Sequence, residues 1–237
     1  MTKQKKNKIN FDINSTPFIL RNLKVIPILL VFLFYVSCED QKSTSKEVDL
    51  PFIGHHDIAF EETEEYKVGD TIFHTVPSWT YLTQDSIMLS SDEIDDQIWI
   101  ADFFFSYCPT ICPPMTKAMR ELTDSLSQYR TELTFLSFSI DPDRDTPSRL
   151  RLYRDRHDAT AENWYFLTGD EAATHRLGID GFQLFANADE NAPGGFAHSS
   201  NFVLIDKNQH IRGLYDGLDP ESRSKLIHDA KLLLDGN

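Results

Sequence analysis

The chain is poor in cysteine, with three in 237 residues, and its longest uncharged apolar run is too short to span a bilayer. It also lacks a repeat of fixed period and a long low-complexity tract, which excludes solenoids and disordered scaffolds. Basic residues are outnumbered 23 to 37 by acidic ones, which gives a formal charge of −14. Nucleic-acid binding is therefore not expected, because it normally requires a basic face.

The N-terminal residues have a different composition from the rest. Residues 1–37 sum to +5, so the remaining 200 residues sum to −19. The run from Val25 to Val36 has twelve uncharged residues, which suits the apolar region of a signal peptide. Cys38 follows a small residue and precedes a polar stretch, an arrangement that resembles the lipobox of bacterial lipoproteins. The resemblance implies that residues 1–37 are a signal and that lipid on Cys38 tethers the protein in the periplasm or cell envelope.

An uncleaved N-terminal anchor is the alternative, with Cys38 as an incidental thiol. Either arrangement places the body outside the cytoplasm at a membrane. Residues 38–69 are interpreted as an acidic tether and irregular lead-in segment, in which Leu50–Ile53 is an apolar patch able to dock on the body. Residues 70–237 are interpreted as one domain.

The hydrophobic pattern of this domain alternates between strands and helices, which predicts an α/β fold with a mixed central sheet flanked by helices. The first two strands are expected to pair as an N-terminal hairpin. Strands are predicted at Thr71–Val76, Thr80–Leu89, Ile98–Ser106, Thr134–Ile140, Trp164–Leu167, Phe202–Ile205 and Ile211–Tyr215. Helices are predicted from Pro113 or Pro114 to Leu126 and over Pro147–His157, Glu171–Leu177 and Glu221–Leu234.

Cys108 and Cys112 lie between the first long buried strand and the helix that follows it, which is where thioredoxin-like folds keep their cysteines. Pro109, Pro113 and Pro114 oppose continuous helix there, so both thiols are expected in the loop at the helix N-terminus. The helix dipole favours thiolates at this position. The spacing of three intervening residues, in place of the two of CxxC, suits a soft-metal site and does not forbid a disulfide. A purely structural disulfide is disfavoured, because so short a loop constrains the unfolded chain little.

A site with two thiolates commonly takes imidazole as a third ligand. His198 is the candidate, because it precedes a predicted strand in a loop that lies against the cysteines in thioredoxin-like folds. Thiol oxidoreductases carry a cis-proline there, but no proline occurs from Gly194 to Asp219, which favours coordination over disulfide exchange. The other histidines are interpreted as surface residues: His55, His56, His74, His157, His175, His210 and His228.

The segments CPTICPPM, DPDRDTP and AHSSNFVLID together resemble the Sco/SenC family of copper chaperones, over Leu50 to Leu234. The resemblance implies a thioredoxin-like fold and copper binding by Cys108, Cys112 and His198, with Cu(I) expected and Cu(II) as the alternative. It also implies delivery to the dinuclear copper centre of cytochrome c oxidase. The implied partners are the copper-bearing oxidase subunit and other periplasmic copper carriers. Ala197 departs from an acid that some relatives have before the histidine.

Asp141 and Asp145 match the acidic turn of that family. They could act beside the metal ligands or face a partner, but turn and helix-cap chemistry explains them equally well and is preferred.

Two enzymatic alternatives remain. A thiol–disulfide oxidoreductase would use Cys108 and Cys112 as its catalytic pair to keep a recipient's cysteines reduced. The absence of CxxC and of the nearby proline counts against this role. A peroxidase of the peroxiredoxin type ranks last, because neither cysteine has a threonine three residues before it.

Overall fold

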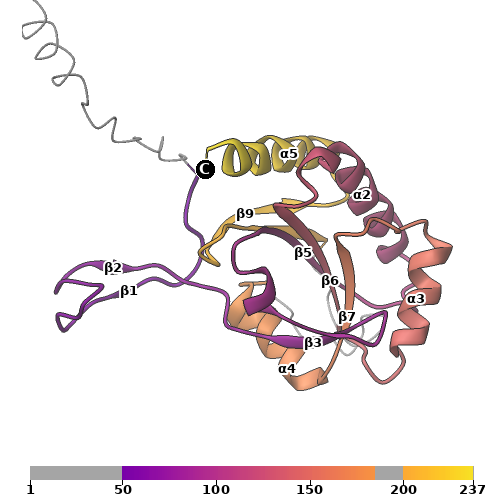
Figure 1. The fold of residues 1–237 in the computed structure, drawn as a ribbon, viewed down its shortest axis with the longest axis horizontal. Coiled ribbons are helices and arrows are strands. Elements are labelled where there is room, and N and C mark those ends of the chain that lie inside the picture. The colour runs from indigo at the N-terminus through magenta and orange to yellow at the C-terminus, as the bar shows by residue number, and fades with distance from the viewer. Residues whose placement is uncertain (1–49, 185–199, 237) are drawn as a thin grey trace, which may run out of the picture. The chain divides into compact units, whose positions relative to one another are not determined.

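The computed structural model describes residues 50–184 and 200–236 (Figure 1). The predicted signal segment, Cys38 and His198 lie outside these residues. The chain divides into residues 1–44 and a compact unit from Ser45 to Asn237. No helix in the described ranges is both long and apolar enough to cross a membrane.

A seven-stranded mixed sheet forms the centre of the unit, in the order β4-β3-β7-β6-β5-β8-β9. Its middle consists of three parallel strands, β5 (Ile98–Phe104), β6 (Leu133–Ser139) and β7 (Trp164–Thr168). The remaining strands pair antiparallel at both sides: β3 (Thr80–Thr83), β4 (Met88–Ser90), β8 (Asn201–Ile205) and β9 (Ile211–Asp216). The predicted mixed α/β architecture is confirmed.

Helices cover both faces of this sheet, so β5 is buried on both sides. Ile98, Ile100 and Phe104 face a core that includes side chains of α2 (Cys112–Ser125), α3 (Pro147–Arg156) and α5 (Pro220–Asp235). Trp99 and Ala101 face a second core with the region after α4 (Glu171–Arg176), where the helix continues as a π-helical turn, η4 (Leu177–Gly181). The unit also has two short 3-10 helices, η2 (Ser91–Ile94) and η3 (Ser127–Tyr129). Figure 1 shows α2 and α5 side by side.

The N-terminal hairpin is present, but its strands differ from those predicted. Residues 71–72 form β2 (Thr71–Ile72), which pairs with β1 (Asp57–Ile58) and not with residues 80–89. The predicted strand Thr80–Leu89 is itself a hairpin of β3 and β4, with Ser86 at a φ of 61° in the turn. Hydropathy alternation did not reveal this turn, because a serine and not a glycine adopts the left-handed conformation there.

The apolar patch Leu50–Ile53 docks on β9, as the sequence suggested. Ile53 forms a bridge with Ile211, with an N–O distance of 2.9 Å. Arg212 donates to the backbone oxygens of Leu50 at 2.7 Å and Pro51 at 3.1 Å, and it pairs with Asp206 at 2.8 Å. One buried guanidinium therefore holds the lead-in segment on the sheet.

Replacing Arg212→Met should lower the free energy of unfolding by about 3–5 kcal/mol, because it leaves the buried Asp206 carboxylate without its cation. Urea unfolding of residues 45–237 measures this loss. Arg130→Met at an exposed position is the matched control and should change stability by less than about 0.5 kcal/mol. Equal effects of the two substitutions would contradict the role assigned to Arg212.

Candidate metal centre

The loop that carries the cysteines connects β5 to α2. The chain leaves β5 after Phe104 and turns so that the Cys108 N–H donates to the Phe105 carbonyl at 3.2 Å. α2 begins at Cys112, one residue before the earlier of the two predicted starts. Two prolines follow in its first turn, where a missing N–H costs nothing. Cys108 is therefore a loop residue, whereas Cys112 is the first residue of the helix.

The start of α2 is anchored by a hydroxyl pair beneath the loop. Thr116 Oγ1 donates to the Cys112 carbonyl at 2.9 Å, and it also hydrogen-bonds the Tyr153 hydroxyl of α3 at 2.8 Å. Both side chains are buried. The backbone of Cys112 is thus tied to a second helix, which limits its movement.

Both cysteines are free thiols, and they are 5% and 1% exposed. Burial acts to raise the pKa of Cys108, but hydrogen bonds from the Cys112 and Thr110 backbones and side chains outweigh it and lower this pKa overall. Burial raises the pKa of Cys112 far above its usual value, and the neighbouring Cys108 and Asp102 add to the rise. Cys108 is consequently the thiol that ionises first, as expected at a helix N-terminus.

Asp102 lies on β5 and is a buried acid that affects the cysteines. It is 2% exposed, and its Oδ1 has no hydrogen-bond partner among the residues that the structure describes. Burial raises the pKa of this carboxyl to about 7, although a hydrogen bond with Ser137 acts in the opposite direction. The sequence showed only an acid inside an apolar strand. Its hydrogen bond with Ser137 and its effect on Cys112 could not be predicted from that pattern.

Asp145 contacts the cysteine loop directly. Its carboxylate is fully buried and accepts from the Ser106 N–H at 3.0 Å, from the Ser106 hydroxyl, and from the Ser139 hydroxyl at 2.6 Å. Arg149 Nε donates to the same Ser106 hydroxyl at 2.8 Å. One carboxylate thus joins the ends of β5 and β6 just before Cys108. The adjacent Thr146 caps α3, as predicted.

The Asp141 carboxylate has a different partner from that of Asp145. Its carboxylate forms an ion pair with Arg144, and its backbone N–H donates to the Ser139 hydroxyl at 3.1 Å. The two acids of the turn therefore differ, since Asp145 reaches the loop and Asp141 reaches an arginine at the surface.

Ser106, Tyr107 and Arg149 are neighbours of the site that the sequence analysis missed. Tyr107 precedes Cys108 and is 49% exposed, and its ring lies 4.1 Å from the Arg149 guanidinium and 5.0 Å from that of Arg144. The available signal was an arginine four residues after Asp145, in the first turn of α3.

The histidines that the structure describes do not complete a metal site. Across residues 50–184 and 200–236, no group of three or more His, Cys, Asp or Glu side chains is placed to hold a metal ion. His74 binds the Gly181 carbonyl at 2.8 Å, His157 packs against Tyr153, and His210 packs near Phe52. His198 lies outside the described residues, but β8 begins three residues after it.

The N-terminal end of β8 lies at the same end of the sheet as the cysteine loop. β8 runs antiparallel to β5, and Val203 pairs with Ala101. Asn201 and Ser200 therefore lie toward the end of β5 from which the cysteine loop departs.

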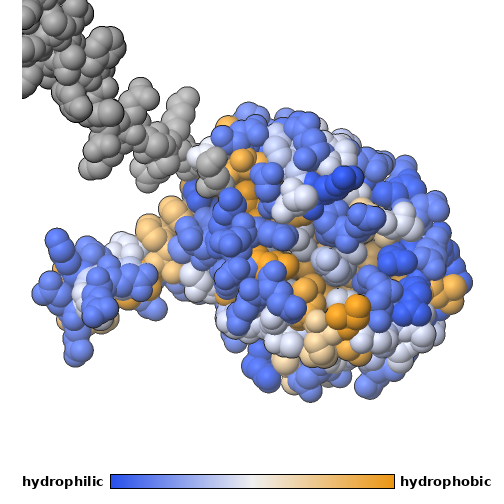
Figure 2. All heavy atoms as spheres, viewed as in Figure 1, coloured by the Kyte–Doolittle hydropathy of each residue, from blue (hydrophilic) through white to orange (hydrophobic). Residues whose placement is uncertain are grey.

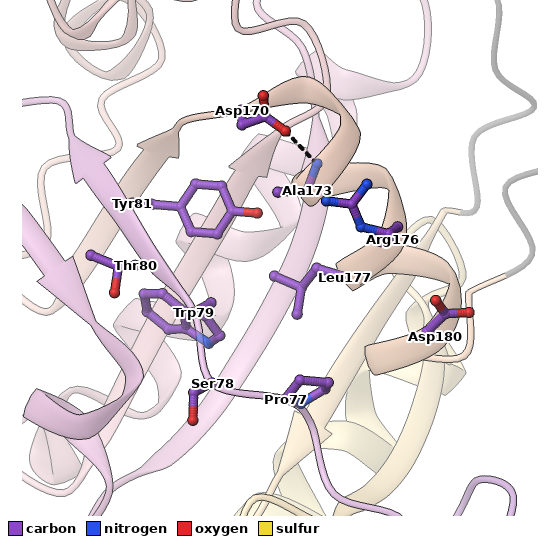
Figure 3. Close-up of a pocket in the computed structure, with 10 residues that line it drawn as sticks. All are labelled: Pro77, Ser78, Trp79, Thr80, Tyr81, Asp170, Ala173, Arg176, Leu177 and Asp180. Carbon is purple, nitrogen blue, oxygen red and sulfur yellow. Dashed lines mark hydrogen bonds between the residues drawn. The ribbon is translucent and has the colours of Figure 1, made fainter.

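A separate pocket of about 350 Å³ lies between β3 and α4, lined by Trp79, Tyr81, Arg176, Leu177 and others (Figure 3). Its aromatic side chains belong to the core on the opposite face of the sheet from the two cysteines. This pocket is therefore distinct from the cysteine site.

The raised pKa of Asp102 predicts a pH-dependent stability. Its pKa is about 7 in the folded protein against an ordinary value of 3.8, so the folded state binds the proton more tightly. The associated stability is complete below about pH 4 and is lost as the pH rises through 7. Asp102→Asn should remove this component, on the order of 4 kcal/mol, from the pH dependence of unfolding. Asp96→Asn at an exposed site is the control, and equal pH profiles for both variants would refute the assignment.

Asp145→Asn should loosen the loop, because an amide cannot accept from both serines with the strength of a carboxylate. Alkylation of Cys108 by iodoacetamide is expected to accelerate by about tenfold or more, since one lost charge-assisted hydrogen bond is worth about 1.5–3 kcal/mol. Asp143→Asn, in the same turn but exposed, should leave the rate unchanged. An unchanged rate in Asp145→Asn would show that the carboxylate does not hold the loop.

Comparisons with known proteins show the family to which this fold belongs. The SCO1/SenC family model matches residues 70–234. The SCO1 protein homolog of Bacillus subtilis (strain 168) is 28% identical over 166 residues, covering 70% of this chain and 86% of the relative. A SCO1/SenC family lipoprotein from Bacillus anthracis str. Ames is 30% identical, with a TM-score of 0.62, over 68% of this chain and 95% of that one.

Two further structures extend the comparison. BsSco, described as a member of the Sco family of cytochrome c oxidase assembly proteins with a disulfide switch, is 28% identical, with a TM-score of 0.59, over 67% of this chain and 92% of that one. Yeast Sco1 with copper bound is 21% identical, with a TM-score of 0.53, over 67% of this chain and 89% of that one, and supports the fold alone. The family match covers more than half of the chain. This protein therefore belongs to the SCO1/SenC family.

Proposed function

We propose that this protein is a membrane-tethered metallochaperone that binds copper and delivers it to the dinuclear copper centre of cytochrome c oxidase. The observation that carries the proposal is the pair of free, buried cysteines at the N-terminus of α2 in a SCO1/SenC domain. Relatives of the same fold are described with copper bound, and BsSco is described as an oxidase assembly protein.

The chemistry of the cysteine pair suits Cu(I). Thiolates are soft ligands that select this ion. Because the pKa of Cys108 is lowered, this thiol gives up its proton readily, and Cys112 follows when metal replaces its proton. The low solvent exposure of both sulfurs protects a bound ion from water. Cu(II) is the alternative form.

His198 is the proposed third ligand. The end of β8 nearest to it lies toward the cysteine loop, which supports this assignment. Three ligands in a trigonal arrangement leave room for a ligand from the recipient to enter. Copper can then pass by stepwise ligand exchange to cysteines and histidines of the copper-bearing oxidase subunit. Other periplasmic copper carriers can supply the copper to this protein by the same kind of exchange.

Asp145 is proposed to support copper binding indirectly, by holding the loop that carries Cys108. Its bonds to Ser106 set the position from which Cys108 departs. Asp141 is proposed to stabilise the turn through Arg144, near the surface that a recipient would approach.

The tether is proposed to be lipid on Cys38, with residues 1–37 as the signal, residues 38–69 as tether and lead-in segment, and residues 70–237 as the domain. The description of the B. anthracis relative as a lipoprotein supports this arrangement. The body would then work in the periplasm or cell envelope.

A thiol–disulfide oxidoreductase is the second candidate, and the description of BsSco with a disulfide switch favours it. In this reaction the Cys108 thiolate attacks a recipient disulfide and forms a mixed disulfide, and Cys112 then attacks Cys108. Two electrons pass to the recipient, which leaves as a dithiol, while Cys108 and Cys112 become a disulfide. The separated pKa values of the two thiols suit these roles.

A Cu(I) titration of reduced residues 45–237 under anaerobic conditions, against a competing chelator, tests the proposal. We expect one copper ion per chain, and His198→Ala should weaken its retention by at least about tenfold, or about 1.4 kcal/mol. His228→Ala, at an exposed site on α5, is the matched control.

Unchanged affinity in His198→Ala would remove the histidine from the site. Failure of the reduced wild-type protein to bind copper tightly would refute the metallochaperone and favour the oxidoreductase. Disulfide exchange that persists in His198→Ala would then support that second candidate.

A further inference from the structure

The hairpin formed by β1 and β2, residues 57–72, projects from the body of the domain (Figure 1). Its strands pair through Asp57–Ile72 and Ile58–Thr71. Backbone hydrogen bonds between Ala59 and Asp70 at 2.9 Å and between Gly69 and Ala59 at 2.8 Å continue the pairing toward the tip. The hairpin is therefore an ordered element.

One face of this hairpin is apolar and becomes more exposed with distance from the body. Ile58 ends β1, and the backbone bonds of Ala59 continue the pairing beyond it. Phe60, two residues after Ile58, is therefore expected on the same face, because alternate residues of paired extended chain point to the same side. Phe73 follows β2, contacts His56 edge-on at 5.1 Å and stacks on Phe52. The exposed fractions are 37% for Phe73, 47% for Ile58 and 86% for Phe60.

An ordered phenylalanine with 86% exposure is unusual in a folded domain, because its burial would be favourable. Large exposed apolar side chains that gather on one element typically mark an interaction surface. Figure 2 shows hydrophilic surface over most of the projecting part of the hairpin and hydrophobic surface where the hairpin joins the body. Polar groups therefore border the apolar residues, as they do at the rim of a protein interface.

The rim of the hairpin is strongly acidic. Between residues 57 and 72 the chain has one basic side chain, Lys67, and six acidic ones: Asp57, Glu61, Glu62, Glu64, Glu65 and Asp70. This negative charge repels an anionic bilayer, and it also repels a second copy of the same hairpin. It attracts a protein surface rich in lysine and arginine.

The hairpin lies at the end of the sheet opposite to the cysteines. Its lead-in residue Ile53 bridges Ile211, which pairs with Ile205, and Ile205 pairs with Trp99 near the start of β5. The cysteine loop leaves the other end of this seven-residue strand, about 20 Å away. Both surfaces can therefore be occupied at the same time.

We propose that Ile58, Phe60 and Phe73 form a docking surface for a protein partner that presents the apolar face of an amphipathic helix bordered by lysine or arginine side chains. Phe60 is the anchor that packs against this apolar face, and the surrounding carboxylates pair with the basic side chains at its border. This surface is independent of copper binding and holds the partner while the cysteine loop remains accessible.

Two fluorescein-labelled peptides of equal length and charge test the proposal by fluorescence anisotropy with residues 45–237. One is an amphipathic helix of lysine and leucine, and the other replaces leucine by serine. The lysine–leucine peptide should bind more tightly, and its affinity should fall with added salt. Phe60→Ser should weaken its binding by at least about tenfold, as expected for an aromatic anchor.

Leu152→Ser is the matched control, because Leu152 is also an exposed apolar residue, at 50%, but lies on α3. Leu152→Ser should leave peptide binding unchanged. Phe60→Ser should leave Cu(I) retention unchanged, so failure of the docking proposal can be distinguished from failure of the metallochaperone proposal. Equal affinity of wild type and Phe60→Ser, or of both peptides, would overturn the proposal. Binding to anionic vesicles or self-association that requires Phe60 would also overturn it, by identifying a membrane or a second copy as the occupant.

Discussion

The buried carboxylate of Asp145 is the constraint on which the geometry of the cysteine site depends. Parallel strands bring the ends of β5 and β6 to one edge of the sheet, but pairing alone does not determine how the chain continues. Asp145 accepts hydrogen bonds from Ser106 after β5 and from Ser139 at the end of β6, so it joins both ends. An unpaired carboxylate at this depth would be costly, which makes the arrangement nearly obligatory once the sheet forms. This network therefore determines the position of Cys108, which lies two residues beyond Ser106.

Within that geometry, the two sulfurs are chemically unequal because their surroundings differ. Cys108 lies where backbone groups donate hydrogen bonds to it, whereas Cys112 is packed inside the core above the acid of β5. A thiolate next to a protonated thiol provides one ligand immediately and a second one only when a metal displaces the proton. The same inequality would separate an attacking from a resolving cysteine. The described site is therefore compatible with copper binding and with disulfide exchange. Only copper binding calls for a third ligand, the proposed His198.

Much of the fold could be predicted from the sequence, because the buried parallel strands are long apolar runs and the helices have clear starts at proline and threonine. β5 and α3 were placed to within two residues. The pairing of residues 71–76 was wrong, because strands of two residues have too little pattern to identify a partner and Ser86 hides a turn. The position of Cys108 and Cys112 at the start of α2 could be predicted from the neighbouring prolines, whereas their role as metal ligands stays a prediction. The contacts of Asp145 and the exposure of Phe60 could not be predicted, because both depend on which distant segments fold against them.

The position of β8 in the sheet determines when the sheet can be completed during synthesis and folding. β5 is flanked by β6, about 30 residues later in the chain, and by β8, about 100 residues later. Contacts of such high sequence separation form late, because the entropy of closing a long loop must be offset first. A chain made from its N-terminus thus presents both cysteines well before the strand that completes their sheet is available. The finished domain, and with it a protected pair of thiols, can exist only after almost the whole polypeptide has emerged.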